Sequence, residues 1–237
     1  MHFYISMDDL TKIGIKYNTD KATFHNYTGF YNEYFKTVRD EKLTILEIGI
    51  LNGNSLLTLQ EYFPNAEIHA IDIVPKSVKE YGSRIHTYLC SQVDEDKLNE
   101  LFSDMKFDII VDDGSHLTLH QLQSFGFLFK KLKSGGLYVC EDLHTSLHKN
   151  YINSTTIPLD IFKNYDGKKL EITEISAEDN EYINEHIKEI NVYRRDVNAY
   201  MCYACSTVCN REYEKCKSCN VDLSPENSSY TSIIVKK

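Results

Sequence analysis

FDIIVDDGSH, residues 107–116, is the stretch that decides the fold, and GGLYVCEDLHTS, residues 135–146, repeats its pattern. Each contains a short apolar run, FDIIV or LYVC, with the length and the β-branched or aromatic content of a buried strand. The acids that end the two runs are Asp112 and Asp113 in the first and Glu141 and Asp142 in the second. The pattern predicts two buried strands that each carry carboxylates at one end.

The segment between these runs, LHQLQSFGFLFKKLKSGG, predicts a helix. Leu122, Phe125 and Phe129 recur at helical spacing and fall on one face, and the pair Gly135 and Gly136 predicts the helix stop. A strand, a helix and a strand in succession form a βαβ unit, in which the two strands are parallel and end at the same edge of the sheet. Ligands bind at that edge in open α/β sheets.

Three or four carboxylates and His116 are therefore expected to converge at one edge of the sheet. Mutual repulsion makes such a cluster unfavourable without a cation. Oxygen ligands favour a hard ion, Mg²⁺ first, with Mn²⁺ or Ca²⁺ as the next choices. The alternative interpretation is that the acids are solvated loop residues and that His116 is a turn histidine.

A second platform is predicted by LTILEIGILNGNSLLTLQEYF, residues 43–63, which reads as a strand, a glycine turn and a helix start. Such a turn can hold a nucleoside-like ligand, and no ATP- or GTP-type P-loop motif is present in the sequence. Asp72 ends the next predicted strand, EIHAIDIV, about 20 residues after the turn, where carboxylates bind ribose hydroxyls. A lone acid such as Asp72 is more often a solvated turn residue.

Length and composition set the class of protein. The 237 residues suffice for one sizeable α/β domain with an appendage. The net charge of −9 does not favour nucleic acid as a partner. No apolar run approaches the roughly 20 residues of a membrane span, and the N-terminal residues lack a secretory-signal pattern. We expect a cytoplasmic protein without a membrane partner.

Near the C-terminus, CYACSTVCNREYEKCKSC at residues 202–219 contains two C-x2-C pairs. Cys202, Cys205, Cys216 and Cys219 have the spacing of a four-thiolate structural Zn²⁺ site. Cys209 is a possible replacement ligand. The alternatives are a disulfide pair or free thiols, and a partner- or RNA-binding role for the insert is the competing function.

Five motifs in this order resemble class I S-adenosylmethionine (SAM)-dependent methyltransferases: LEIGILNGNS, AIDIV, SQVD, VDDGSH and CEDLHTS. Two longer segments, NTDKATFHNY and HQLQSFGFLFKKLKSGGLYVCEDLHTS, are similar to the metal-dependent sugar O-methyltransferases of the macrolide (mycinamicin) type and from polysaccharide gene clusters. The resemblance covers roughly residues 8–148. It implies a Rossmann-like α/β fold whose seven-stranded, mostly parallel sheet has helices on both faces.

The organisation expected from this resemblance and from the cysteine spacing has four parts. These are an N-terminal helical or lid segment (1–40), a SAM-binding core (41–198), a zinc-knuckle insert (199–222) and a C-terminal strand that completes the core sheet (223–237). Within the first part, the aromatic residues Tyr27, Tyr31, Tyr34 and Phe35 predict a helix packed on the sheet edge. Asp20, Lys21 and His25 lack a helical pattern, which is typical of a loop that closes over a site.

The resemblance also implies residue roles. It places Glu47 and Gly49 against the methionine part of SAM, Asp72 on the ribose hydroxyls, Gln92 near the adenine and Asp112 near the sulfonium. The remaining members of the expected SAM-binding set are Asp20, Lys21, Asn52, Gly53, Ser55 and Ile73. Asp113, Glu141 and Asp142 are implied as ligands of Mg²⁺ or Mn²⁺, and His116 as the general base. His120, His144 and His148 are nearby alternatives for the base.

The expected reaction is methyl transfer from SAM to a sugar hydroxyl, in a free sugar, a nucleotide-linked sugar or a glycoconjugate. A sugar hydroxyl is a poor nucleophile at neutral pH, so a cation that lowers its pKa and a histidine that takes its proton are both required. The alternatives are the same chemistry on a catechol or another vicinal diol, and a zinc-knuckle RNA-binding methyltransferase. The sequence leaves a homo-oligomer open.

Overall fold

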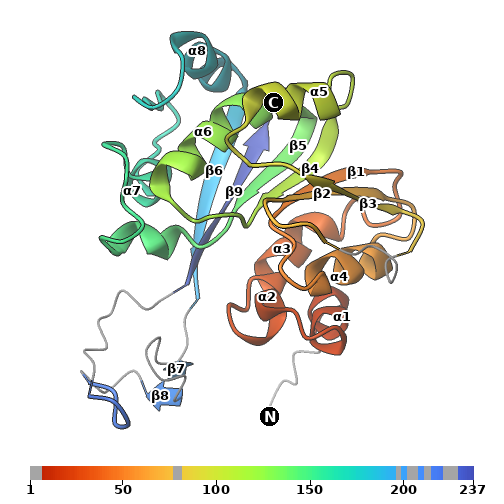
Figure 1. Cartoon of the computed structure of the whole chain (residues 1–237), viewed down its shortest axis with the longest axis vertical. Coiled ribbons are helices and arrows are strands. Elements are labelled where there is room, and N and C mark those ends of the chain that lie inside the picture. The colour runs from red at the N-terminus through yellow and green to blue at the C-terminus, as the bar shows by residue number, and fades with distance from the viewer. Residues whose placement is uncertain (1–6, 77–81, 196–198, 202–207, 211–214, 221–228) are drawn as a thin grey trace.

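The computed structural model describes residues 7–76, 82–195, 199–201, 208–210, 215–220 and 229–237. Its main body is a seven-stranded sheet in the order β3-β2-β1-β4-β5-β9-β6 (Figure 1). The strands are β1 (Thr44–Ile48), β2 (Glu67–Asp72), β3 (Ile85–Leu89), β4 (Phe107–Asp112), β5 (Leu132–Cys140), β6 (Ile187–Arg194) and β9 (Tyr230–Lys236). Strands β1 to β5 pair in parallel, and β9 pairs antiparallel with β5 and β6. The predicted seven-stranded, mostly parallel sheet is confirmed.

Helices cover both faces of the sheet, as Figure 1 shows. On one face lie α1 (Asp9–Lys16), α3 (Thr28–Phe35) and α4 (Asn54–Tyr62), and on the other lie α5 (Glu95–Leu101), α6 (Thr118–Leu128), α7 (Pro158–Lys163) and α8 (Ala177–His186). The alternation of side chains along β4 divides the core: Ile109 and Val111 pack with the first group, and Ile110 packs with the second. Phe107 also packs with the second group, because the strand is irregular between Phe107 and Ile109. Because both faces are buried, the strands read as the apolar runs seen in the sequence.

The predicted aromatic helix is α3, and its place differs from the prediction. Tyr31 and Phe35 are buried, together with Tyr27 just before the helix, in the cluster that contains Ile45 and Ile109 of the central strands. The helix therefore packs on the face of the sheet and not on its edge. Between α1 and α3 lies the short helix α2 (Asp20–Thr23).

One predicted boundary was wrong. The helix before β5 ends at Leu128 and continues as a 3-10 turn, η1 (Phe129–Lys131), whereas Gly135 and Gly136 lie inside β5. There, Gly135 has a φ of +76°, and a Cβ on Gly136 would come within 2.9 Å of the Asp108 carbonyl oxygen, so both glycines serve the irregular pairing of β4 with β5.

The alternating pattern of KKLEITEIS, residues 168–176, indicates a possible strand, but this segment forms none. The backbone N–H groups of Leu170 and Ile172 donate to the side chains of Asn184 and Asn180, on α8. These amides take the place of a neighbouring strand, and they satisfy the backbone of an extended segment without a sheet.

Two short strands, β7 (Ala199–Met201) and β8 (Val208–Asn210), pair antiparallel between β6 and β9 in the chain. The 3-10 turn η2 (Leu143–Leu147) follows β5. Within the described ranges, no helix has both the length and the apolar character to cross a membrane.

Candidate active site

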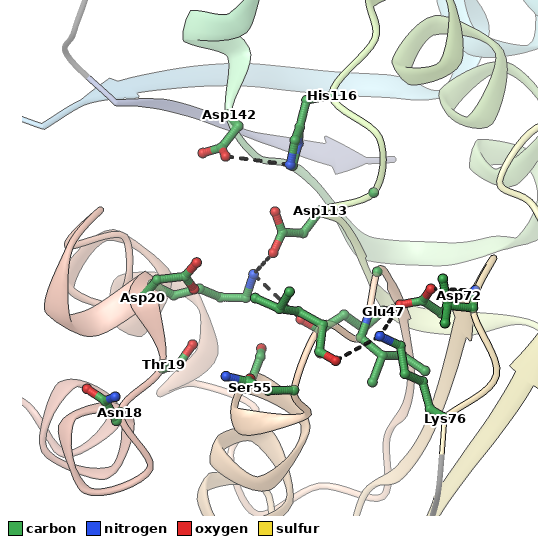
Figure 2. Close-up of a pocket in the computed structure, with 17 residues that line it drawn as sticks. Asn18, Thr19, Asp20, Glu47, Ser55, Asp72, Lys76, Asp113, His116 and Asp142 are labelled. Atoms are coloured by element: carbon green, nitrogen blue, oxygen red, sulfur yellow. Dashed lines mark hydrogen bonds and ion pairs between the residues drawn. The ribbon is translucent and has the colours of Figure 1, made fainter. Parts of the chain in front are cut away.

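A cavity of about 400 Å³ lies at the carboxyl ends of the parallel strands, and its volume is in the range of small-molecule sites. The predicted site residues that line it are Asp20, Lys21, Glu47, Gly49, Asn52, Ser55, Asp72, Asp113, His116 and Asp142. Those that do not line it are Gly53, Ile73, Gln92, Asp112 and Glu141. Figure 2 shows His116 and Asp142 at one end of the cavity and Asp72 with Lys76 at the other.

The glycine turn after β1 forms the floor of the cavity. Gly49 has a φ of +91°, and a Cβ at this position would overlap the backbone oxygen of Asp113. Gly53, with a φ of +79°, then begins α4. The turn therefore requires glycine for conformation and for close approach, and it brings the ends of β1 and β4 together beneath the cavity.

Asp72 ends β2, and its carboxylate is held by two backbone groups. It accepts hydrogen bonds from the N–H groups of Ile50 at 2.9 Å and Val74 at 2.8 Å, and the Lys76 ammonium lies 3.4 Å away. Burial raises the pKa of Asp72, but the two N–H groups and Lys76 outweigh burial, and the net pKa is lowered. The result is a fixed, ionised acceptor at this end of the cavity. Ile73, the next residue, is 72 % exposed.

At the opposite end, Asp113, His116 and Asp142 each present a possible ligand atom, and these atoms lie within 4.8 Å of one another. Asp113 directly follows β4 and Asp142 lies two residues after β5, so the βαβ unit brings the acids together as predicted. His116 Nε2 lies 3.8 Å from Asp142 Oδ2. The backbone of His116 has a φ of +59°, an uncommon conformation that is often found at functional sites.

Lys21 of α2 lies among the carboxylates. Its ammonium contacts Asp113, lies 2.9 Å from the Glu141 carboxylate and is 3.6 Å from Glu47 Oε1. The sequence placed Lys21 with SAM and Glu141 with the metal, whereas the structure pairs the two directly. Of the three predicted metal ligands, Asp113 and Asp142 share the group with His116, and Glu141 lies deeper, against Lys21.

In the part of the chain that the structure describes, Lys21 is the single ammonium among three neighbouring carboxyl groups. Burial would lower the pKa of Lys21, but Asp113, Glu141 and Glu47 raise it well above its ordinary value. Burial in turn raises the pKa of Glu47 to about 7 and that of Glu141 well above its usual range, although Lys21 opposes both shifts. One ammonium faces the buried carboxyl groups of Glu47 and Glu141 and the partly exposed carboxyl group of Asp113. The oxygens of Glu47 have no hydrogen-bond partner among the described residues. The donor set thus fits a further cation.

Several side chains besides His116 surround Asp142. The Tyr27 hydroxyl donates to Asp142 Oδ1 at 2.8 Å, and the Nδ1 atoms of His25 and His144 lie 3.5 and 3.9 Å from that oxygen. Burial raises the pKa of Asp142, but His25, His144, His116 and Tyr27 together lower it. The non-helical character of NTDKATFHNY was the signal for His25; Tyr27 read only as a core residue.

Asp112 and Gln92 form a buried network beneath the cavity. The Gln92 side-chain amide donates to Asp112 at 3.1 Å, and its carbonyl oxygen accepts from the Ser115 backbone N–H at 2.7 Å. Ser124 and Tyr138 also donate to Asp112. Burial raises the pKa of Asp112 to about 6. These contacts hold the turn that leads to His116.

The zinc prediction falls largely outside the described residues, which exclude Cys202 and Cys205. Of the other pair, Cys216 is buried and Cys219 is exposed in a turn. The Ser218 backbone N–H donates to Cys216 Sγ at 3.4 Å.

Comparison with known proteins shows similarity to O-methyltransferases over part of the chain. No protein-family model matches the chain. It is 36 % identical over 145 residues to the 8-demethyl-8-alpha-L-rhamnosyl tetracenomycin-C 2'-O-methyltransferase of Streptomyces olivaceus, covering 58 % of this chain and 38 % of the relative. It is 36 % identical over 148 residues to the mycinamicin VI 2''-O-methyltransferase of Micromonospora griseorubida, covering 58 % and 37 %. The chain thus matches less than half of these curated relatives.

Among solved structures, the MycE methyltransferase of the mycinamycin biosynthetic pathway, in complex with Mg, SAH and mycinamycin VI, superposes with a TM-score of 0.67. The match covers 97 % of this chain and 54 % of that one at 23 % identity, and it establishes the fold. The chain therefore has the class I methyltransferase fold and is similar in sequence, over a little more than half its length, to sugar O-methyltransferases of the mycinamicin and tetracenomycin type.

Proposed function

We propose that the protein is a SAM-dependent, divalent-metal-dependent O-methyltransferase that acts on a sugar hydroxyl. One observation carries this proposal: a single cavity joins the glycine turn and Asp72 to the group formed by Asp113, His116 and Asp142. A methyl donor and a hydroxyl acceptor need such adjoining sites. The sugar is proposed because the relatives named above methylate sugars of glycosylated natural products.

The donor half of the cavity would hold SAM. Asp72 is an ionised acceptor for the ribose hydroxyls. Gly49 leaves the space that a side chain would fill, and Glu47 lies in the same wall. When bound, SAM supplies a methyl group on a positively charged sulfur. Asp20, Asn52 and Ser55 also line this cavity and complete the proposed donor site, with Gly53 and Ile73 beside it.

The acceptor half would hold a divalent cation, Mg²⁺ or Mn²⁺, through Asp113 and Asp142. When bound, the ion supplies positive charge that lowers the pKa of an acceptor hydroxyl. Glu141 completes the proposed ligand set, and for this it must exchange its contact with Lys21 for one with the ion. The excess of carboxylates over ammonium groups supports this set.

His116 would take the proton of the hydroxyl. Its Nε2 faces Asp142, and its buried Nδ1 has no hydrogen-bond partner in the described part of the chain. A histidine in its neutral form accepts a proton near neutral pH. Asp112 and Gln92 are proposed to act beneath the cavity, by holding the turn through the Ser115 backbone rather than by touching the sulfonium or the adenine.

The test is methyl transfer by the full chain. SAM consumption would be followed with methyl glycosides and with a catechol, with Mg²⁺ and with EDTA. We expect turnover on a sugar that EDTA removes. Transfer to the catechol alone would favour the competing diol chemistry, and metal-independent transfer would contradict the metal role.

The insert between β6 and β9 is proposed to hold a structural Zn²⁺ through Cys202, Cys205, Cys216 and Cys219. The spacing supports this proposal, as does the N–H donated to Cys216 Sγ, because backbone donors commonly stabilise a ligating thiolate. A small insert cannot bury a core of its own, and a metal can replace that core. Such thiolates persist in a reducing compartment such as the cytoplasm.

A further inference from the structure

Arg195 directly follows β6, and no acid among the described residues pairs with it. Its guanidinium stacks over the Phe24 ring, 5.2 Å from the centroid. Its Nε is buried without a hydrogen-bond partner, and no ion pair joins it to any residue that the structure describes. Burial lowers the pKa of Arg195, which means that its surroundings oppose the charge.

Other arginines of the described chain are satisfied. Arg39 pairs with Asp9 at 3.0 Å and donates to the Tyr62 carbonyl. Arg84 donates to three backbone carbonyls. An arginine side chain stays charged, and a buried N–H of such a group is costly to leave without an acceptor. The contrast indicates that the acceptor for Arg195 comes from a bound ligand rather than from the protein.

A short series of contacts connects Arg195 to the candidate metal group. Its backbone N–H donates to the Ser229 carbonyl at 2.9 Å, which closes the base of the insert between β6 and β9. The Ser229 hydroxyl lies 2.8 Å from His25 Nδ1, and that nitrogen lies 3.5 Å from Asp142 Oδ1. Arg195 is therefore connected to the Asp142 end of the cavity, opposite the proposed ribose site, although it does not itself line the cavity.

The acids of the site do not account for this arginine. Asp113 and Glu141 contact Lys21, and Asp142 is bonded to Tyr27 and flanked by imidazoles. A second fixed cation next to an acidic, metal-binding cluster would weaken metal binding unless an anion offset its charge. Arginine is also the side chain best suited to bind a carboxylate or phosphate with two hydrogen bonds.

We propose that Arg195 binds an anionic group of the acceptor, a carboxylate or a phosphate, so that the enzyme methylates an acidic or phosphorylated sugar. The proposal rests on the proposed methyltransferase function and adds the acceptor class. The diol of the sugar would lie at Asp113 and Asp142 while its anion reaches Arg195 past His25. Arg195 would then be a specificity-determining residue of the acceptor site.

The test measures binding by calorimetry, on the full chain with Mg²⁺ and S-adenosylhomocysteine. The probes are methyl glucoside, methyl glucuronoside and glucose 1-phosphate, which present no anion, a carboxylate and a phosphate. We expect at least one anionic probe to bind about tenfold or more tightly than the neutral probe, the effect of a charge-assisted hydrogen bond. The tighter of the two anions identifies the group.

Variants then assign the preference to this residue. Arg195→Gln should remove the preference and Arg195→Lys should keep part of it, whereas Arg39→Gln, with the same change in charge at a distant site, should keep it whole. Wild-type protein that binds neither anion more tightly than the neutral glucoside overturns the proposal, and so does Arg195→Gln that retains the preference. The wild-type comparison decides even where Arg195→Gln fails to fold.

The two proposals fail separately. Methyl transfer to neutral sugars without a preference for anions overturns only the role of Arg195. Anion binding that depends on Arg195, without methyl transfer to any diol, overturns the proposed function and leaves an anion site in place.

Discussion

The ammonium of Lys21 lies 2.9 Å from the carboxylate of Glu141, and both side chains are buried. Lys21 comes from the N-terminal helix α2, and Glu141 follows the central strand β5. The pair therefore fastens the N-terminal segment to the carboxyl edge of the sheet at the place where a cation is proposed to bind. Lys21 and the proposed metal ion would then both offset the charge of the same carboxylates.

Lys21→Met should destabilise the metal-free protein by about 3–5 kcal/mol, because it leaves buried carboxylates without a partner. Saturating Mg²⁺ should recover part of the loss, since the ion supplies the missing charge. Urea unfolding with EDTA and with Mg²⁺ measures both effects. Lys12→Met, which breaks an exposed pair with Asp9, should change little in either buffer. A Lys21→Met protein as stable as wild type in EDTA would contradict the electrostatic account.

Gly49→Ala should weaken donor binding strongly. A Cβ would overlap the Asp113 carbonyl oxygen at a residue with a φ of +91°. Gly167 has a φ of +85°, and nothing lies within 4 Å of its Cβ position, so Gly167→Ala isolates the conformational cost of about 1–2 kcal/mol. Calorimetric titration with S-adenosylhomocysteine should show a loss of affinity of at least about tenfold for Gly49→Ala and none for Gly167→Ala. Equal affinities would show that the turn does not touch the ligand.

The positions of Asp113 and Asp142 were predictable because they depend on local rules. An apolar run fixes each strand, and the βαβ connection fixes the shared edge. Lys21 follows no such rule, since it stands 92 residues from Asp113 in the chain and its place depends on how α2 packs. The helix stop predicted at Gly135 and Gly136 was wrong because a glycine pair also occurs where a strand is irregular. KKLEITEIS misled because the side chains of Asn180 and Asn184 replaced the missing strand partner.

His116→Ala should lower methyl transfer by about 10²-fold or more, the usual contribution of a general base. Affinity for S-adenosylhomocysteine should be unchanged, because the residue lies at the acceptor end of the cavity. Initial rates and calorimetric titration separate the two readouts. His148→Ala, which removes a nearby half-buried histidine, should keep full activity. Loss of activity with His148→Ala but not with His116→Ala would show that His116 is not the general base.

His69 should make the protein less stable in mild acid. It lies in β2, where it is hydrogen-bonded to Tyr88 and stacked on His86. Burial, and to a smaller extent the charge of His86, lower its pKa below 6.5, and the smaller opposite effect of Glu67 does not offset them. The unfolded chain therefore takes up a proton there at a higher pH than the folded chain does. The contribution of His69 is present above pH 6.5 and is lost as pH falls below it. Urea unfolding between pH 8 and 5 should show a shallower decline for His69→Asn, with His120 and His144 accounting for part of the remainder.

The cysteine insert should bind about one Zn²⁺ per chain, and Cys216→Ser should remove it. Metal analysis of purified protein gives the stoichiometry, and Cys90→Ala, a change at a buried cysteine at the end of β3, should retain the metal. The seven-stranded sheet closes through β9, whose pairs with β5 and β6 involve no residue of the insert. Loss of zinc should therefore leave the unfolding of the main domain nearly unchanged while the insert becomes open to proteolysis. Wild-type protein without zinc, or Cys216→Ser with a full equivalent, would contradict the four-thiolate site.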